Sequence, residues 1–299
     1  MSDGNSYLIL GATGLIGSYL YEKLKLHGET VFGTSRKTKV TSSYIKFDVM
    51  TDSIQALLAL IEGNIKAVVC LGETNINACF EKYSEAYEIN VEKTKQILSA
   101  LAERGAHIIY FSTDNVFDGE NGCYTEADNP RPVNQYGRMK LEIEQFMLKN
   151  LPESCIFRLP KVISVESRVK NLFSEMEAGY ARGEISCIKG NRRSHVYIND
   201  VYDACRLAWS KGLRGLYHIA DDRPYTRLEL AIQFLGMMEK DVSAVHEHDL
   251  SWFHLKDGYP LDVSLCNQKF KNETDYSFSD MATIMRKYID NKDSIAENR

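Results

Sequence analysis

A buried strand, a glycine-rich turn and a helix follow one another at the start of the sequence, and this feature constrains the fold most. The apolar run Tyr7-Leu-Ile-Leu10 predicts a strand covered on both faces. Gly11-Ala-Thr-Gly14-Leu-Ile-Gly17 follows, and Leu20, Leu24 and Leu26 then recur at helical spacing. Because strand-like and helical segments continue to alternate, we expect an α/β protein with a doubly wound parallel sheet.

The glycine turn also predicts a phosphate-binding site. Glycines permit a tight turn and a close backbone approach, and a helix N-terminus offers unpaired N–H groups to a pyrophosphate. Such a turn can also join a strand to a helix that binds nothing, but its place at the start of an alternating chain favours a dinucleotide cofactor. The predicted contacts in this turn are Gly11, Thr13, Gly14, Leu15, Ile16 and Gly17.

The end of the second predicted strand carries basic residues. An acidic residue at this place would bind the ribose hydroxyls of NAD, but the sequence reads Ser35-Arg36-Lys37. A guanidinium and an ammonium pair with a 2′-phosphate. We therefore predict NADP(H), bound through Ser35 and Arg36, with NAD(H) as the second choice. A solvated basic loop is the alternative interpretation.

Length and composition exclude several classes of protein. The 299 residues, 44% of them hydrophobic, can bury the core of one large domain or two modest ones. The net charge of −5 gives no basic footprint for nucleic acid. No leader pattern opens the sequence and no apolar stretch is long enough to span a bilayer, so we expect a cytoplasmic protein. The 7 cysteines are scattered without the short spacings of a zinc site, and we expect no metal.

Hydroxyl side chains are predicted at the end of a central strand. Ile108 to Phe111 form a short apolar run that predicts a buried strand, and Ser112 and Thr113 follow it directly. These hydroxyls should therefore lie at the carboxyl edge of the sheet.

A tyrosine and a lysine are predicted to share one face of the next long helix. Asn134 can cap this helix, and Tyr136 and Lys140 stand four residues apart. An ammonium beside a phenol lowers the phenol pKa and brings proton transfer toward neutral pH, so Tyr136 is a candidate general acid. A tyrosine and a lysine at this spacing can also simply pack against the protein.

Both segments together resemble a known family. Ser-Thr-Asp-x-Val-Phe-Asp-Gly, from Ser112, and Tyr-Gly-x-x-Lys, from Tyr136, resemble the extended short-chain dehydrogenase/reductases, closest to the dTDP-4-dehydrorhamnose reductase family. The resemblance implies a Rossmann-type dinucleotide-binding domain in residues 1–160, completed by a strand and a helix from about 195–220. A smaller α/β substrate-binding domain is implied in residues 161–299.

The resemblance also implies roles for single residues. Thr113, Tyr136 and Lys140 would be catalytic, the phenol protonating the developing alkoxide while Lys140 holds the nicotinamide ribose. Further cofactor contacts would be Asp48, Val49, Leu71, Gly72, Tyr136, Lys140 and Leu159. Substrate contacts would be Ser112, Asn115, Lys161 and Arg193.

Two of the matched residues have a second interpretation. Arg193 either binds a substrate phosphate or pairs with Asp200 or another carboxylate. Asn90 either interacts with the ends of the central strands or only satisfies a buried backbone group.

The implied activity is the NADPH-dependent reduction of a nucleotide-activated 4-keto-deoxysugar, in a protein that could form a homodimer. A sugar epimerase of the same superfamily and a non-catalytic NADP-binding regulatory subunit stay open. A dehydratase is disfavoured, because such enzymes follow Ser-Thr-Asp with Glu and position 115 is Asn. The sugar also stays open, because Gly190-Asn-Arg-Arg-Ser-His-Val stands where the rhamnose enzymes have Asp-Gln-x-Gly-x-Pro-Thr.

Overall fold

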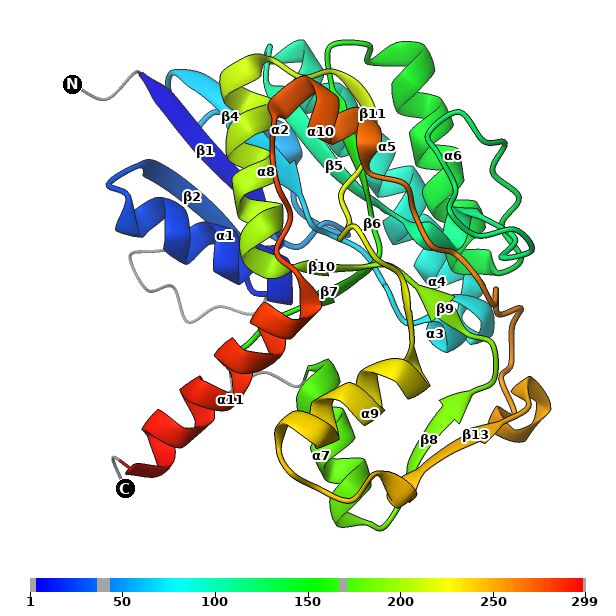
Figure 1. The fold of residues 1–299 in the computed structure, drawn as a ribbon. Helices are drawn as coiled ribbons and strands as arrows, with labels where there is room; N and C mark the ends of the chain where they lie inside the picture. The colour runs from blue at the N-terminus through cyan, green and yellow to red at the C-terminus, as the bar shows by residue number, and fades with distance from the viewer. Residues whose placement is uncertain (1–3, 37–43, 167–170, 298–299) are drawn as a thin grey trace. The chain divides into compact units, whose positions relative to one another are not determined.

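The first apolar segment forms strand β1 (Asn5–Leu10), which lies inside a seven-stranded sheet (Figure 1). The structure is a computed structural model that describes residues 4–36, 44–166 and 171–297. The other strands of this sheet are β2 (Thr30–Ser35), β3 (Tyr44–Lys46), β4 (Asn64–Val69), β5 (His107–Thr113), β6 (Cys155–Leu159) and β11 (Gly215–His218).

The strand order is β11-β6-β5-β4-β1-β2-β3, and β1 to β5 pair in parallel. The chain leaves β1 toward one edge through β2 and β3 and then continues on the other side of β1 at β4. This is the order of a doubly wound sheet, in which ligands bind beyond the carboxyl ends of the strands at the point where the order reverses. The predicted fold class is confirmed.

Helices cover both faces of the sheet, as a parallel sheet requires. The helical elements are α1 (Leu15–Leu26), α2 (Ile54–Leu58), α3 (Ile76–Glu81), α4 (Tyr83–Tyr87), η1 (Glu88–Lys93), α5 (Thr94–Glu103), η2 (Asp114–Val116), α6 (Gln135–Asn150) and α8 (Ile198–Lys211). Leu8 and Leu10 of β1 enter a core that includes buried residues of α2, α5 and α6. Tyr7, on the opposite side of the strand, packs edge-on against Trp209 of α8 at 5.1 Å between ring centroids.

The chain divides into two compact units. The first comprises Met1–Val116, Pro132–Arg158 and Tyr202–Tyr217, and the second Phe117–Arg131, Leu159–Val201 and His218–Arg299. Phe117–Arg131 thus belongs to the second unit although it lies inside the range 1–160 that the sequence assigns to the dinucleotide-binding domain.

The second unit contains short paired strands and three longer helices. The strands are β7 (Lys161–Ile163) with β10 (His195–Tyr197), β9 (Arg192–Arg193) with β12 (Tyr225–Thr226), and β8 (Ile185–Ile188) with β13 (Val245–His248). The helical elements are α7 (Leu172–Ala181), α9 (Arg227–Met237), η3 (Val242–Ala244), η4 (Leu250–Phe253), α10 (Gln268–Thr274) and α11 (Met281–Glu297). The ring centroid of Phe173 lies 5.1 Å from those of Phe234 and Tyr288, and these two rings lie 5.8 Å from each other. The three rings join α7, α9 and α11 in one aromatic core.

Candidate active site

The glycine turn after β1 is packed so closely that Gly11 and Gly17 leave no room for a side chain. Gly11 has φ +89°, and a Cβ there would lie 3.0 Å from the Cys70 carbonyl oxygen beyond β4. A Cβ at Gly17 would lie 2.3 Å from the Gly11 carbonyl oxygen. No acidic residue stands in the first turn of α1, so the partial positive charge of this helix end is not neutralised from within the helix. The turn therefore fits the pyrophosphate of a dinucleotide.

The predicted adenosine contacts follow β2 and β3. Ser35 is buried, Arg36 is exposed, and Lys37 lies outside the described residues. Asp48 begins a turn in which its own carboxylate accepts the Met50 N–H at 3.0 Å. The exposed guanidinium is available to a ligand, and its role in NADP(H) selection stays a prediction.

Asn90 organises the loop that follows β4. It lies in the π-helical turn η1, a kind of helix distortion that is frequent at functional sites. Its amide accepts the Glu73 N–H at 2.8 Å and donates to the Glu73 carbonyl at 2.9 Å. A Cβ at Gly72, where φ is +135°, would lie 2.6 Å from Asn90 Oδ1. Asn90 thus satisfies both backbone groups of Glu73, directly after the predicted cofactor contacts Leu71 and Gly72.

Helix α6 begins where the sequence predicts. The Asn134 side chain accepts the Gly137 N–H at 2.8 Å and caps the helix. A Cβ at Gly137 would lie 2.1 Å from the Asn115 carbonyl oxygen, so the glycine after Tyr136 lets the helix start directly against η2.

The structure brings the three predicted catalytic residues together. Thr113, at the end of β5, forms a side-chain hydrogen bond with Tyr136 of α6. One turn further along α6, Lys140 Nζ donates to the Phe111 carbonyl oxygen at 2.8 Å. The same ammonium lies 4.5 Å from the ring centroid of Tyr110 and 6.0 Å from that of Tyr136. The set therefore bridges one strand end and one helix face.

The protonation of this set differs from the prediction. Burial raises the pKa of the Tyr136 phenol above 10.0, and the Asp114 carboxylate raises it further, while the bond to Thr113 lowers it. The net displacement of the phenol pKa is therefore upward, because burial outweighs the causes that lower it; the lowering by Lys140 itself stays a prediction. Burial lowers the pKa of Lys140 to about 8, which still leaves mainly the ammonium at neutral pH. Tyr136 accordingly keeps its proton, which is the form a general acid needs.

Two of the predicted substrate contacts are engaged inside the protein. Ser112 donates to the Glu144 carboxylate. Asn115 Nδ2 donates to Asp114 Oδ1 at 2.8 Å and to Thr113 Oγ1 at 3.2 Å. Asn115 therefore orients the Thr113 hydroxyl, and a direct contact of either residue with substrate stays a prediction.

The remaining predicted contacts belong to the second unit. Leu159 is buried at the end of β6, and Lys161 is exposed at the start of β7. The Arg193 guanidinium lies 5.0 Å from the ring centroid of Tyr259 and donates to the Pro260 carbonyl oxygen at 3.4 Å. Asp200 accepts hydrogen bonds from Tyr276 and Ser279. The phosphate role of Arg193 stays a prediction.

Sequence reasoning missed a buried ion pair beside the predicted catalytic residues. Glu144 of α6 and Arg158 of β6 form a two-pronged contact, with Nε to Oε1 at 3.0 Å and Nη2 to Oε2 at 2.7 Å. Their side chains are only 1% and 3% exposed. One signal was available: Glu144 stands four residues after Lys140 and eight after Tyr136, and so lies on their side of the helix.

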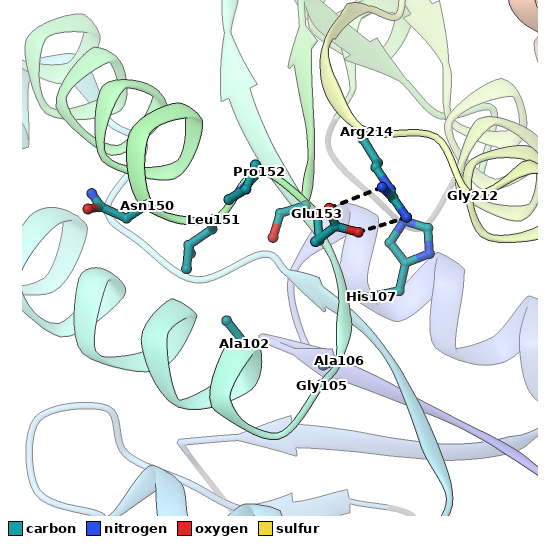
Figure 2. A pocket seen from close by; sticks show the side chains of 11 residues that line it. Ala102, Gly105, Ala106, His107, Asn150, Leu151, Pro152, Glu153, Gly212 and Arg214 are labelled. Carbon is teal, nitrogen blue, oxygen red and sulfur yellow. Dashed lines mark hydrogen bonds and ion pairs between the residues drawn. The ribbon is translucent and has the colours of Figure 1, made fainter.

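A cavity of about 430 Å³ lies at the amino ends of β5, β6 and β11, opposite to the carboxyl ends that carry the candidate site (Figure 2). Figure 2 shows the Arg214–Glu153 ion pair, with 2.7 Å between Nη2 and Oε2, among the residues that line this cavity. His107 Nε2 contacts the Leu213 carbonyl oxygen at 3.1 Å. Because ligands of doubly wound sheets bind at the carboxyl ends of the strands, this cavity is not the candidate active site.

In the part of the chain that the structure describes, no helix is long and apolar enough to cross a membrane. The same residues contain no group of three or more His, Cys, Asp or Glu side chains that could hold a metal ion.

Comparisons with known proteins agree with the fold. The profile of the family described as RmlD substrate binding domain matches residues 5–293. Methionine adenosyltransferase 2 subunit beta of Danio rerio is 28% identical over 234 residues, which cover 75% of this chain and 71% of that protein. A Haloferax volcanii protein, "Probable low-salt glycan biosynthesis reductase Agl14", is 30% identical over 249 residues, which cover 79% of this chain and 81% of that protein.

Solved structures show the same architecture. The dTDP-4-dehydrorhamnose reductase of Bacillus anthracis, determined in complex with NADP, superposes with a TM-score of 0.85 at 21% identity and covers 97% of this chain and 100% of its own. The profile match over nearly the whole sequence shows that the chain belongs to the RmlD substrate binding domain family.

Proposed function

We propose that the protein is an NADPH-dependent reductase that acts on a nucleotide-activated 4-keto sugar. The observation that carries this proposal is the contact of Thr113 with Tyr136, with Lys140 one helical turn away, in the same unit as the glycine turn. The named relative from Haloferax volcanii is described as a reductase, which supports the same reaction class.

The residues of the chain would divide the proton chemistry among them. Tyr136 holds a proton at neutral pH and would donate it to the oxygen of the keto group as negative charge develops there. Thr113, oriented by Asn115, would donate a hydrogen bond to the same oxygen. Lys140 would contact the nicotinamide ribose. Bound NADPH would supply the hydride.

The preference for NADPH rests on Arg36 at the end of β2. This exposed guanidinium can form a charge-assisted hydrogen bond with a 2′-phosphate. The complex of the Bacillus anthracis reductase with NADP supports the choice, since its fold covers 97% of this chain. NAD(H) is the second choice.

Substitution of Tyr136 by Phe tests the reductase. NADPH oxidation should be followed with candidate nucleotide 4-keto sugars for the wild type and for Tyr136→Phe. We expect the variant to lose at least about 100-fold in turnover, the usual contribution of a positioned proton donor, while it binds NADPH normally. Near-normal turnover by the variant would remove Tyr136 from the mechanism. Sugar conversion without stoichiometric NADPH loss would instead indicate an epimerase.

A non-catalytic regulatory subunit is the second candidate function. It is favoured by the match to methionine adenosyltransferase 2 subunit beta, whose name describes a subunit of a larger enzyme. The separating experiment mixes the purified chain with a methionine adenosyltransferase catalytic subunit. A stable complex, with no NADPH oxidation on any keto sugar, would replace the reductase proposal by this one.

A further inference from the structure

A continuous set of contacts fastens α6 to the end of β5. Tyr136 contacts Thr113, Lys140 Nζ donates to the Phe111 carbonyl oxygen, and Ser112 donates to Glu144. Three turns of one helix face therefore meet the last three residues of one strand. Glu144 makes the last contact, and it is in turn held by Arg158 of the neighbouring strand β6.

Burial of two charges requires a reason, because an apolar pair of similar volume often stabilises a fold equally well. Glu144 and Arg158 are 1% and 2% exposed as whole residues, and the carboxylate accepts from both Arg158 and Ser112. Lys140, 6% exposed, stands one helical turn before Glu144. A buried ammonium needs a nearby negative charge in order to stay protonated.

We propose that Glu144, fixed by Arg158 and Ser112, is a positioning residue: it holds the α6 face that it shares with Lys140 against the end of β5 and supplies a negative charge one helical turn from this buried lysine. The proposal rests on the proposed function for its consequence in catalysis, because it acts through the predicted catalytic lysine.

The other groups around Lys140 leave this task to Glu144. They are Cys70 after β4, Cys79 of α3, Tyr110 of β5 and Tyr136 of α6. Burial raises the pKa of the Cys70 thiol to about 12 and raises those of both phenols, so these three are neutral at pH 7. Burial lowers the pKa of Lys140 to about 8, and Cys70, Glu144 and Cys79 act against that fall. The two cysteines can do so only as thiolates, whereas Glu144 carries its charge as a carboxylate paired with Arg158.

The test measures the pKa of Lys140 directly, by NMR titration of protein labelled with ¹³C at the lysine ε-carbons. The Lys140 signal is assigned by its loss in Lys140→Met. In Glu144→Gln we expect the Lys140 pKa to fall by about one unit, because the negative charge of Glu144 is gone and the positive charge of Arg158 is left unbalanced. In Arg158→Met we expect the pKa to rise, because an unbalanced carboxylate remains.

The opposite signs separate electrostatics from structural damage. Both substitutions break the same ion pair, and loosening alone would hydrate Lys140 and raise its pKa toward 10.5 in both variants. Glu142→Gln is the matched control: it removes a carboxylate from the same helix, but one whose ion pair with Lys95 is partly exposed, and it should leave the titration of Lys140 unchanged.

The double variant Glu144→Gln/Arg158→Met leaves no buried charge unpaired and keeps the test available if the single variants unfold. It should also titrate below the wild type. An unchanged or raised Lys140 pKa in Glu144→Gln, or in the double variant, overturns the proposal. Because the titration needs neither NADPH nor sugar, the expected shift in a protein without reductase activity would refute the reductase and retain the role of Glu144.

Discussion

Burial acts on Tyr136 and Lys140 in the same chemical direction, because it favours the uncharged form of each. The phenol pKa moves up and the lysine pKa moves down to about 8. The phenol therefore stays protonated across the physiological range, whereas the lysine loses its charge just above it. The protonation state of this pair depends on how deeply the helix face is buried, which the spacing of the two residues does not reveal.

The first residue-scale prediction concerns pH. As the pH rises through about 8, Lys140 loses the charge that would hold the nicotinamide ribose, so kcat/KM for NADPH oxidation should fall. Lys140→Arg should remove this decline whatever its residual activity, since a guanidinium stays charged. A profile of the wild type that stays flat to pH 9.5 would contradict the assignment.

The second residue-scale prediction concerns Arg36. Its replacement by Ala should weaken NADPH binding by about 1.5 to 3 kcal/mol, the contribution of a charge-assisted hydrogen bond, and leave NADH binding almost unchanged. Binding should be measured by titration calorimetry at low ionic strength, because salt screens an exposed charge. Equal affinities of the wild type for both cofactors would show that Arg36 is only a solvated charge.

At the scale of elements, helices α6 and α9 are specified at their N-termini by local signals. Asn134 caps α6 as predicted, and Thr226 and Glu229 form a reciprocal capping box at α9, with bonds of 2.7 Å and 3.1 Å. Both caps involve residues close in sequence. A reader of the sequence can therefore find where these helices begin.

Asn134→Ala tests how much the α6 cap contributes. The loss of the bond to the Gly137 N–H should lower the free energy of unfolding by about 1 kcal/mol or more, since Asn134 is also fully buried. Thr226→Ala is the matched control, as it removes a cap from α9 in the second unit. Urea denaturation measures both, and only Asn134→Ala should also reduce turnover, because only α6 carries Tyr136.

The proximity of Tyr136 and Lys140 and the glycine turn could be predicted from sequence because each follows a local spacing rule, whereas Thr113 was added to the candidate set only through the resemblance. The Glu144–Arg158 pair could not, because it joins a helix to a neighbouring strand and needs the packed sheet to exist. Asn90 was given two interpretations, and only the folded structure shows that its amide bonds to the backbone of Glu73. The net rise of the phenol pKa could not be predicted, because spacing reports proximity and not desolvation.

At the scale of the whole molecule, one buried carboxyl makes stability depend on pH. Asp221 accepts the His195 N–H at 2.9 Å through Oδ1, and no described residue donates to Oδ2. Burial, reinforced by Asp222 and Asp200, raises the Asp221 pKa to about 8. The unfolded chain has the ordinary value of about 3.9, so the folded protein binds the extra proton between these pH values and loses stability as the pH rises through them.

Asp221→Asn should remove this loss. The amide keeps the acceptor for His195 and carries no charge, so the variant should gain at least about 1 kcal/mol over the wild type at pH 8.5. The difference should shrink toward pH 4, where Asp221 is protonated in both the folded and the unfolded state. Thermal unfolding at a series of pH values measures it, and a gain that is constant with pH would argue against titration of Asp221.

The first unit is built from three separated stretches of chain, and this fixes the order in which it can be completed during synthesis. Strand β6 is made by residue 159, but its outer neighbour β11 only at residues 215–218. At ordinary elongation rates the ribosome needs several seconds for the intervening stretch. Throughout that time β6 presents an unpaired edge, which is a template for aggregation. The nascent chain therefore passes through a stage at which a chaperone has an exposed strand to protect, and this stage ends when β11 closes the sheet.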